Sequence, residues 1–120
     1  MILARLITLV LAVCFSSAVL AHSALIKADP GPRSVLKNTP KVLRLWFNEP
    51  IELLYSKIMI KREGDTKETV LKNLRHVDNQ GSSIEVELPE LATGTIKIHY
   101  KVLSVDGHVV DSDYAFVIKP

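Results

Sequence analysis

The clearest strand pattern in the sequence is Thr95-Ile96-Lys97-Ile98-His99-Tyr100-Lys101-Val102, in which polar and hydrophobic side chains alternate without a break. Alternation with a period of two is typical of a β-strand that has one face in a hydrophobic core and the other in water. The same alternation is found in Lys57–Lys61 and Ile84–Leu88, and no convincing run of apolar residues at helical spacing follows residue 21. The sequence therefore predicts an all-β protein.

Four further strands are expected where short apolar segments stand between turn residues. They cover Ala24–Ala28, Lys41–Phe47, Thr69–Leu74 and Tyr114–Ile118. Strands about 10–12 residues apart, with no helices to cover a sheet, predict an antiparallel sandwich or barrel. We therefore expect a Greek-key β-sandwich or barrel of about seven strands, of the immunoglobulin-like or cupredoxin-like type.

Length and composition indicate one ordinary folded domain. The chain has 120 residues, of which 23% are charged, and its formal net charge is +2. Single domains usually contain roughly 100–150 residues, so most large enzyme architectures are excluded. The composition does not indicate intrinsic disorder, and the charge is too balanced for a polybasic nucleic-acid binder.

The first 21 residues are hydrophobic and predict a secretory signal peptide. Arg5 is their only charged residue, an apolar run over residues 6–15 follows it, and small side chains precede Ala21. We expect cleavage after Ala21. Residues 22–120 then form the mature domain, and His22 becomes its first residue.

Three other fates of this segment are alternatives. Cleavage can also follow Ala18, and Cys14 stands in a sequence that loosely resembles a lipoprotein box, although Val13 occupies a position where Gly or Ala is expected. A retained membrane anchor is the weaker interpretation, because Ser16-Ser17 interrupts the roughly 20 apolar residues that such an anchor needs.

The four histidines are the natural candidates for a functional site, because the mature domain has no cysteine and no glycine-rich phosphate loop. His99 lies on the polar face of its expected strand, opposite Ile98 and Tyr100, and His76 precedes a turn. We expect both to be solvated surface residues.

His108 lies in a different context, in Ser104-Val105-Asp106-Gly107-His108 after the long strand. In an extended segment, residues two apart point the same way, so Asp106 and His108 can present a carboxylate and an imidazole to one point. Gly107 gives the backbone freedom to adjust the angle between them. The alternative is an ordinary Asp-Gly turn without a ligand.

His22 strengthens the case for a metal site. After cleavage it offers its α-amine, with an ordinary pKa of about 7.7–8.0, and its ring Nδ1 as one chelate. Together with His108 and Asp106 this gives three nitrogens and one carboxylate oxygen, a donor set that suits Cu(II). Zinc is the alternative metal, and a frayed chain start is the alternative without metal.

Four motifs of the mature chain together form a recognisable combination. They are His22 directly after the expected cleavage site, Phe47-Asn48-Glu49-Pro50, the stretch from Tyr100 to His108, and the closing Tyr114-Ala115-Phe116-Val117-Ile118. In this combination the chain resembles the CopC copper-resistance proteins of the bacterial periplasm. The resemblance covers essentially the whole mature chain, and the combination is more specific than any single motif.

The resemblance implies a seven-stranded Greek-key sandwich that binds Cu(II). The implied ligands are the amine and imidazole of the N-terminal histidine and the side chains of an Asp-x-His motif, which here are His22, Asp106 and His108. In some members the Glu of a Phe-x-Glu-Pro motif also lies at the metal, which makes Glu49 a further candidate. The alternative for Glu49 is a carboxylate that fixes the turn before Pro50.

Two features depart from the family pattern. Some members carry a methionine-rich Cu(I) site, but here only Met59 remains after cleavage, and one thioether cannot form a multi-sulfur site. We therefore expect a Cu(II)-only binder. Asp111 stands where relatives often have glycine, and we interpret Asp111 and Asp113 as solvated loop carboxylates, although both can favour a nearby cation.

These features together predict a periplasmic protein that sequesters or delivers Cu(II) in copper homeostasis or resistance, without enzymatic turnover. Because protons compete for the nitrogen ligands, acidification should release the ion. The resemblance implies a CopD-type membrane copper transporter as the partner. Two alternatives are a copper monooxygenase-like enzyme, in which an N-terminal histidine also chelates copper, and a metal-free β-sandwich interaction module.

Overall fold

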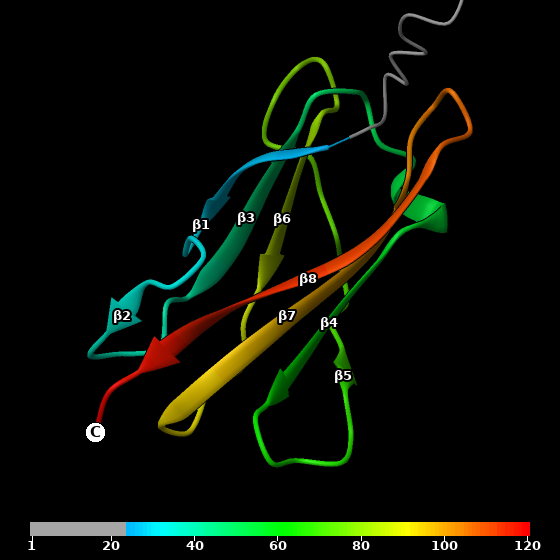
Figure 1. Cartoon of the computed structure of the whole chain (residues 1–120). Helices are drawn as coiled ribbons and strands as arrows, with labels where there is room; N and C mark the ends of the chain where they lie inside the picture. The colour runs from blue at the N-terminus through cyan, green and yellow to red at the C-terminus, as the bar shows by residue number, and fades with distance from the viewer. Residues whose placement is uncertain (1–23) are drawn as a thin grey trace, which may run out of the picture.

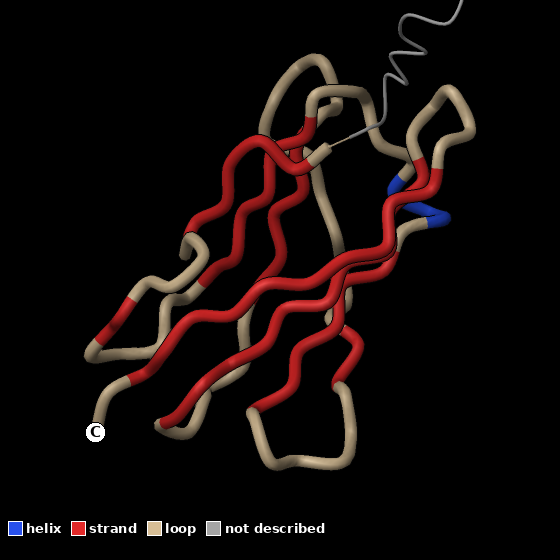
Figure 2. The backbone as a smooth tube through the Cα atoms, in the orientation of Figure 1, coloured by secondary structure: helices blue, strands red, loops and turns tan. Residues whose placement is uncertain are grey.

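The computed structural model describes residues 24–120, in which eight strands form two β-sheets that face each other (Figure 1). The strands are β1 (Leu25–Asp29), β2 (Val35–Leu36), β3 (Val42–Phe47), β4 (Lys57–Arg62), β5 (Thr69–Val70), β6 (Ser83–Glu87), β7 (Gly94–Leu103) and β8 (Val109–Ile118). Within this range the only helical element is the 3-10 turn η1 (Leu53–Tyr55), drawn in blue in Figure 2. The all-β prediction is confirmed.

The two sheets differ in size and both are largely antiparallel. One sheet has the order β1-β3-β6, and the other has the order β2-β8-β7-β4-β5. The short strand β2 runs parallel to β8, whereas the other neighbours pair antiparallel. Strands that are distant in the sequence therefore lie side by side, as expected for a Greek-key sandwich.

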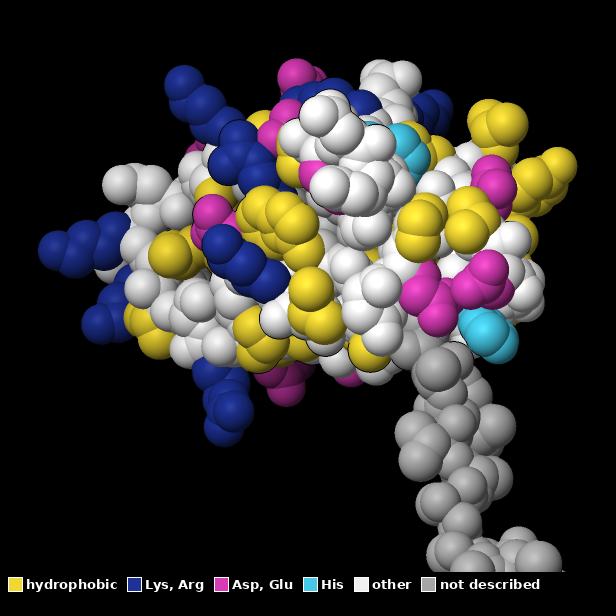
Figure 3. Space-filling model, turned by 90° about the horizontal axis from the view of Figure 1, so that it is seen from above, with side chains coloured by type: hydrophobic (Ala, Val, Ile, Leu, Met, Phe, Trp, Pro, Cys, Tyr) yellow, Lys and Arg dark blue, Asp and Glu magenta, His cyan; other side chains and the backbone are white. Residues whose placement is uncertain are grey.

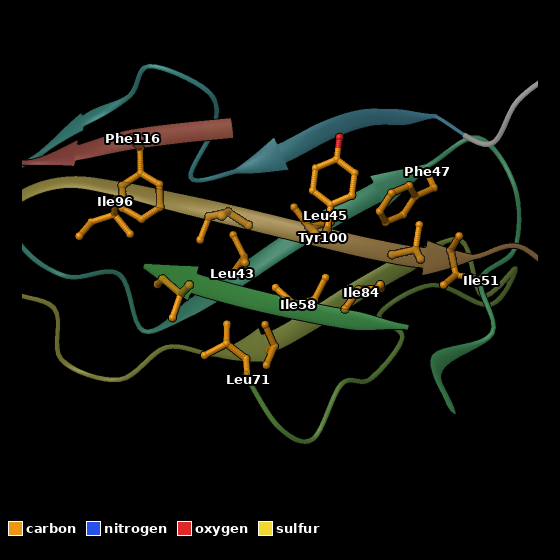
Figure 4. Close-up of a cluster of buried hydrophobic side chains, with 14 of the residues drawn as sticks. Leu43, Leu45, Phe47, Ile51, Ile58, Leu71, Ile84, Ile96, Tyr100 and Phe116 are labelled. Atoms are coloured by element: carbon orange, nitrogen blue, oxygen red, sulfur yellow. The ribbon is translucent and has the colours of Figure 1, made fainter. Parts of the chain in front are cut away.

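Alternate side chains of both sheets form one hydrophobic core (Figure 4). On β3, Leu43, Leu45 and Phe47 are buried while the residues between them stay partly exposed. The buried side chains of β7 are Ile96, Ile98, Tyr100 and Val102, which is the face predicted from the alternation. Each fully buried side chain of this size contributes about 1.5–3 kcal/mol relative to an exposed one, so the sandwich is held by this core.

The last strand is longer than the sequence indicates, because β8 begins at Val109 and not at Tyr114. Its first half carries Asp111, Ser112 and Asp113, whose polarity is typical of a loop. Strand β8 nevertheless pairs with β7 along its whole length, these three residues included. Asp113 also forms an ion pair with Lys97 at 3.5 Å. The interpretation of Asp111 and Asp113 as loop carboxylates is therefore wrong: both are strand residues.

One further strand boundary differs from the expectation, and one strand was not expected at all. The strand expected over Thr69–Leu74 ends at Val70, and Asn73 has a left-handed φ of 65°, which does not fit an extended strand. The strand β2 was not expected, because two residues are too few to give an alternation.

One end of the sandwich brings together segments that are far apart in the sequence. Figure 1 shows the β7–β8 turn, η1 and the start of β1 at this end. The segment that follows β3 is tied to the β7–β8 turn by a bridge between Ile51 and Ser104 and by a hydrogen bond from Glu52 N to Leu103 O at 2.8 Å. The candidate site residues described below lie on these segments.

Candidate metal centre

Asp106 and His108 lie in the tight turn between β7 and β8. Ser104 closes the turn, because its N donates to His108 O at 2.9 Å and its Oγ accepts from His108 N at 3.2 Å. Gly107 has a φ of 88°, a conformation that side chains other than glycine rarely adopt. The two candidate ligands are therefore brought together by a turn, and the extended geometry expected for this segment is wrong.

Glu49 comes to the same place from the other sheet. Strand β3 ends at Phe47, and the chain then passes Glu49 and runs alongside the turn, where Pro50 O accepts from Val105 N at 3.0 Å. This backbone hydrogen bond and the neighbouring bridge at Ser104 fix the position of Glu49 relative to the turn. The contact joins the two sheets at the site.

The side chains of Glu49, Asp106 and His108 form a cluster in which one ligand atom of each lies within 4.8 Å of the others. The distance from His108 Nδ1 to Glu49 Oε2 is 3.7 Å. Glu49 Oε2 is buried and has no hydrogen-bond partner among the described residues. A buried carboxylate oxygen without a partner is unfavourable, and a bound cation removes this cost. One imidazole and two carboxylates are suitable donors for a divalent transition metal.

His22 lies outside the described residues, but the described chain begins close to the cluster. Ala24 N donates to Asn48 Oδ1 at 2.6 Å, and Asn48 N donates to Ala24 O at 3.0 Å. Asn48 is the neighbour of Glu49, so these bonds attach the chain start beside the candidate ligand. Figure 3, viewed from above, shows acidic side chains and a histidine gathered at this end of the molecule, whereas lysines and arginines dominate the opposite end.

Of the other histidines, His99 differs from the expectation of a solvated surface residue. It does lie on the outer face of β7, but its side chain is only 28% exposed. Its Nε2 pairs with Asp111 Oδ1 at 2.5 Å, and its Nδ1 lies 3.4 Å from Glu68 Oε1. The hydrogen bond to Asp111, opposed by partial burial and assisted by Glu68, raises the pKa of His99. Asp111 therefore pairs with a histidine outside the candidate metal cluster.

This pairing predicts a pH-dependent contribution to stability. The pKa of folded His99 is raised above the unfolded value of about 6.5, so the stabilisation is complete below pH 6.5 and is lost as pH rises through the folded pKa. We expect His99→Gln to reduce the loss of unfolding free energy between pH 6 and pH 8.5, measured by urea denaturation of the metal-free protein. The same change at the exposed His76 serves as the control. An equal effect there would contradict the assignment of this pH dependence to His99.

His76 is exposed, as expected, with its Nδ1 at 2.7 Å from Ser83 O. Met59 lies partly exposed on β4 between the buried Ile58 and Ile60. Asn48 and Ser104 stand within two of the quoted motifs, but the motifs gave no indication that these two residues shape the site. Both act through hydrogen bonds to other segments or to the turn backbone, which side-chain patterns do not reveal.

The fold and the cluster together define a class: a β-sandwich domain with a candidate nitrogen and oxygen metal site at one end. The family profile described as the CopC domain matches residues 25–119. The chain therefore belongs to the CopC family, and the resemblance noted from the motifs is confirmed. This family consists of copper-binding resistance proteins and not of enzymes, which confirms the expectation of a non-enzymatic, copper-related role.

Individual relatives agree with this assignment. Protein YobA of Escherichia coli K12 is 28% identical over 102 residues, which cover 85% of this chain and 82% of YobA. The copper transport protein CutJ of Bacillus subtilis is 26% identical over 99 residues, but these cover 82% of this chain and only 18% of CutJ. The crystal structure of CopC from Methylosinus trichosporium OB3b has a TM-score of 0.73 at 29% identity, with 82% of this chain and 95% of that chain covered.

Among residues 24–120 the structure contains no helix with the length and hydrophobicity of a membrane-spanning segment.

Proposed function

We propose that the chain is a periplasmic protein that binds Cu(II) at the Glu49, Asp106 and His108 cluster and sequesters or delivers it. The observation that carries this proposal is the buried oxygen Oε2 of Glu49, which has no hydrogen-bond partner among residues 24–120 and lies near an imidazole and a second carboxylate. The copper-binding character of the family supports copper over zinc as the cargo.

Each residue has a distinct part in this proposal. His108 supplies a ring nitrogen, and Asp106 and Glu49 supply carboxylate oxygens. His22 supplies its amine and its ring nitrogen after cleavage behind Ala21. Hard anionic oxygens favour Cu(II) over Cu(I), and the single thioether of Met59 gives no alternative Cu(I) site. Ligand protonation would release the ion in acid.

The proposed location and partner follow from the same features. Cleavage of the predicted signal peptide would release the domain into the periplasm, where a CopD-type membrane transporter receives the ion. The match to CutJ supports a transporter as the partner, because the region similar to this chain makes up 18% of CutJ, a protein described as a copper transport protein. The exposed hydrophobic side chains Leu54 and Tyr55 of η1, together with Val109, which directly follows His108, offer a contact surface for it.

Calorimetric titration of the protein that begins at His22 tests the proposal. We expect one Cu(II) ion per chain, bound more tightly than Zn(II) because Cu(II) has the highest affinity among divalent first-row metals at such donors. Absence of tight binding at a one-to-one ratio would rule out the copper site and leave the metal-free interaction module.

Glu49→Gln should weaken binding without weakening the fold. The loss of an anionic ligand is expected to reduce Cu(II) affinity by at least about tenfold, since even outer-shell changes typically cost 10–100-fold. The metal-free protein should keep its Tm at pH 8, because the substitution removes a buried charge that has no hydrogen-bond partner at Oε2. Glu52→Gln, an exposed change nearby, is the matched control. A lower Tm with unchanged affinity would assign Glu49 to the turn before Pro50.

A further inference from the structure

Asn48 makes two hydrogen bonds to the first described residue of the chain. Its backbone N donates to Ala24 O at 3.0 Å, and its side-chain Oδ1 accepts from Ala24 N at 2.6 Å. We propose that Asn48 is a positioning residue that holds the start of the mature chain at the metal centre. This inference rests on the proposed function, because it concerns the delivery of His22 to the cluster.

The contact lies where the regular pairing of β1 and β3 ends. The last register pair at this end is Leu25 with Phe47, and the register shifts between Leu25 and Lys27. Beyond Phe47 one more backbone bond, from Asn48 N to Ala24 O, extends the ladder before the chain turns away toward Glu49. The Asn48 side chain supplies the acceptor for Ala24 N at this point, and the amide oxygen takes the part that a backbone carbonyl has in a ladder.

The position of this contact limits where His22 can reach. Two residues of extended chain span at most about 7 Å, so His22 cannot move far from Ala24. Asn48 and Glu49 are consecutive, with Cα atoms about 3.8 Å apart. A fixed Ala24 therefore keeps the amine and ring of His22 within reach of the cluster. Loss of the Asn48 side chain would leave only the backbone bond from Asn48 N to Ala24 O, so this end of the chain would be less ordered and metal binding would have to order it.

A double-mutant cycle measures this role separately from any direct effect on the metal. Cu(II) affinity is determined by competition with a chelator of known affinity for four proteins that begin at position 22: the unchanged protein, Asn48→Ala, His22→Ala and the double variant. We expect Asn48→Ala to weaken binding about 10–100-fold when His22 is present, the range typical of residues that orient ligands. With His22→Ala we expect less than about a twofold effect, because Asn48 then has no imidazole to position and the two substitutions are non-additive.

Ala24→Pro tests the same hydrogen bond from the other side. Proline lacks the N–H that Asn48 Oδ1 accepts, and Ala24 is exposed, so the fold should persist even where Asn48→Ala is unstable. A similar loss of affinity in Ala24→Pro supports the role of the bond. Asn79→Ala, in an exposed turn, is the control and should leave affinity unchanged.

The possible outcomes separate the two proposals. A large effect of His22→Ala with none of Asn48→Ala overturns the positioning role and leaves the copper site intact. An equal effect of Asn48→Ala with and without His22 also overturns it, because Asn48 would then act on Glu49 or on the fold. No effect of His22→Ala on affinity contradicts the chelate itself, and the positioning role is overturned with it.

Discussion

One glycine added before His22 is expected to weaken Cu(II) binding by about 100-fold or more. The extension converts the α-amine into a peptide amide, which is a poor ligand at neutral pH, and so would break the proposed chelate of the amine and the ring. Linked donors gain roughly 10²–10⁴ in affinity over separate ones, and this gain is what the extension removes. Competition titration against a chelator of known affinity measures the effect.

A glycine added after Pro120 is the matched control, because it lengthens the chain at its other terminus. The extension before His22 should also have little effect when His22 is already replaced by Ala. Equal affinity of the extended and unextended proteins would show that the amine does not bind the metal.

His108→Ala is expected to change the proposed Cu(II) site in both its spectrum and its affinity. It deletes one of the three proposed nitrogens and leaves two carboxylates with His22. The electron paramagnetic resonance spectrum should lose one nitrogen coupling, and affinity should fall by at least about tenfold, as expected when a ligand is lost.

His99→Ala is the paired control for this experiment. His99 is engaged by Asp111 and Glu68 on the outer face of the larger sheet and is not part of the cluster. Its loss should leave the spectrum unchanged. A larger change in His99→Ala than in His108→Ala would mean that the wrong histidine is assigned to the metal.

The strands that the sequence predicted well are those with one dry face. Along Thr95–Val102 every second side chain enters the core, so burial imposes the alternation that the sequence displays. The first half of β8 was missed because residues such as Asp111 and Asp113 are exposed on a strand that is stabilised by pairing with β7 and not by burial. Pairing between backbones leaves no mark on side-chain polarity.

The candidate site was predictable in its residue types but not in its geometry. The Asp-Gly-His sequence and the resemblance to CopC proteins pointed to Asp106 and His108, whereas the turn closed by Ser104 became evident only in the structure. The bond between Asn48 and Ala24 joins residues 24 positions apart. Such long-range hydrogen bonds depend on the packing of the whole sandwich, and a single sequence contains no local pattern for them.

The proposed copper site is tested most directly by locating copper in crystals of the protein that begins at His22. Anomalous diffraction at the copper absorption edge gives this location. We predict one peak, in contact with the amine and ring of His22 and with the ring of His108, and with carboxylate oxygens of Asp106 and Glu49 beside it. A peak at His99 or His76, or copper at His108 without His22, would contradict the proposal that His22 and the cluster bind one copper ion together.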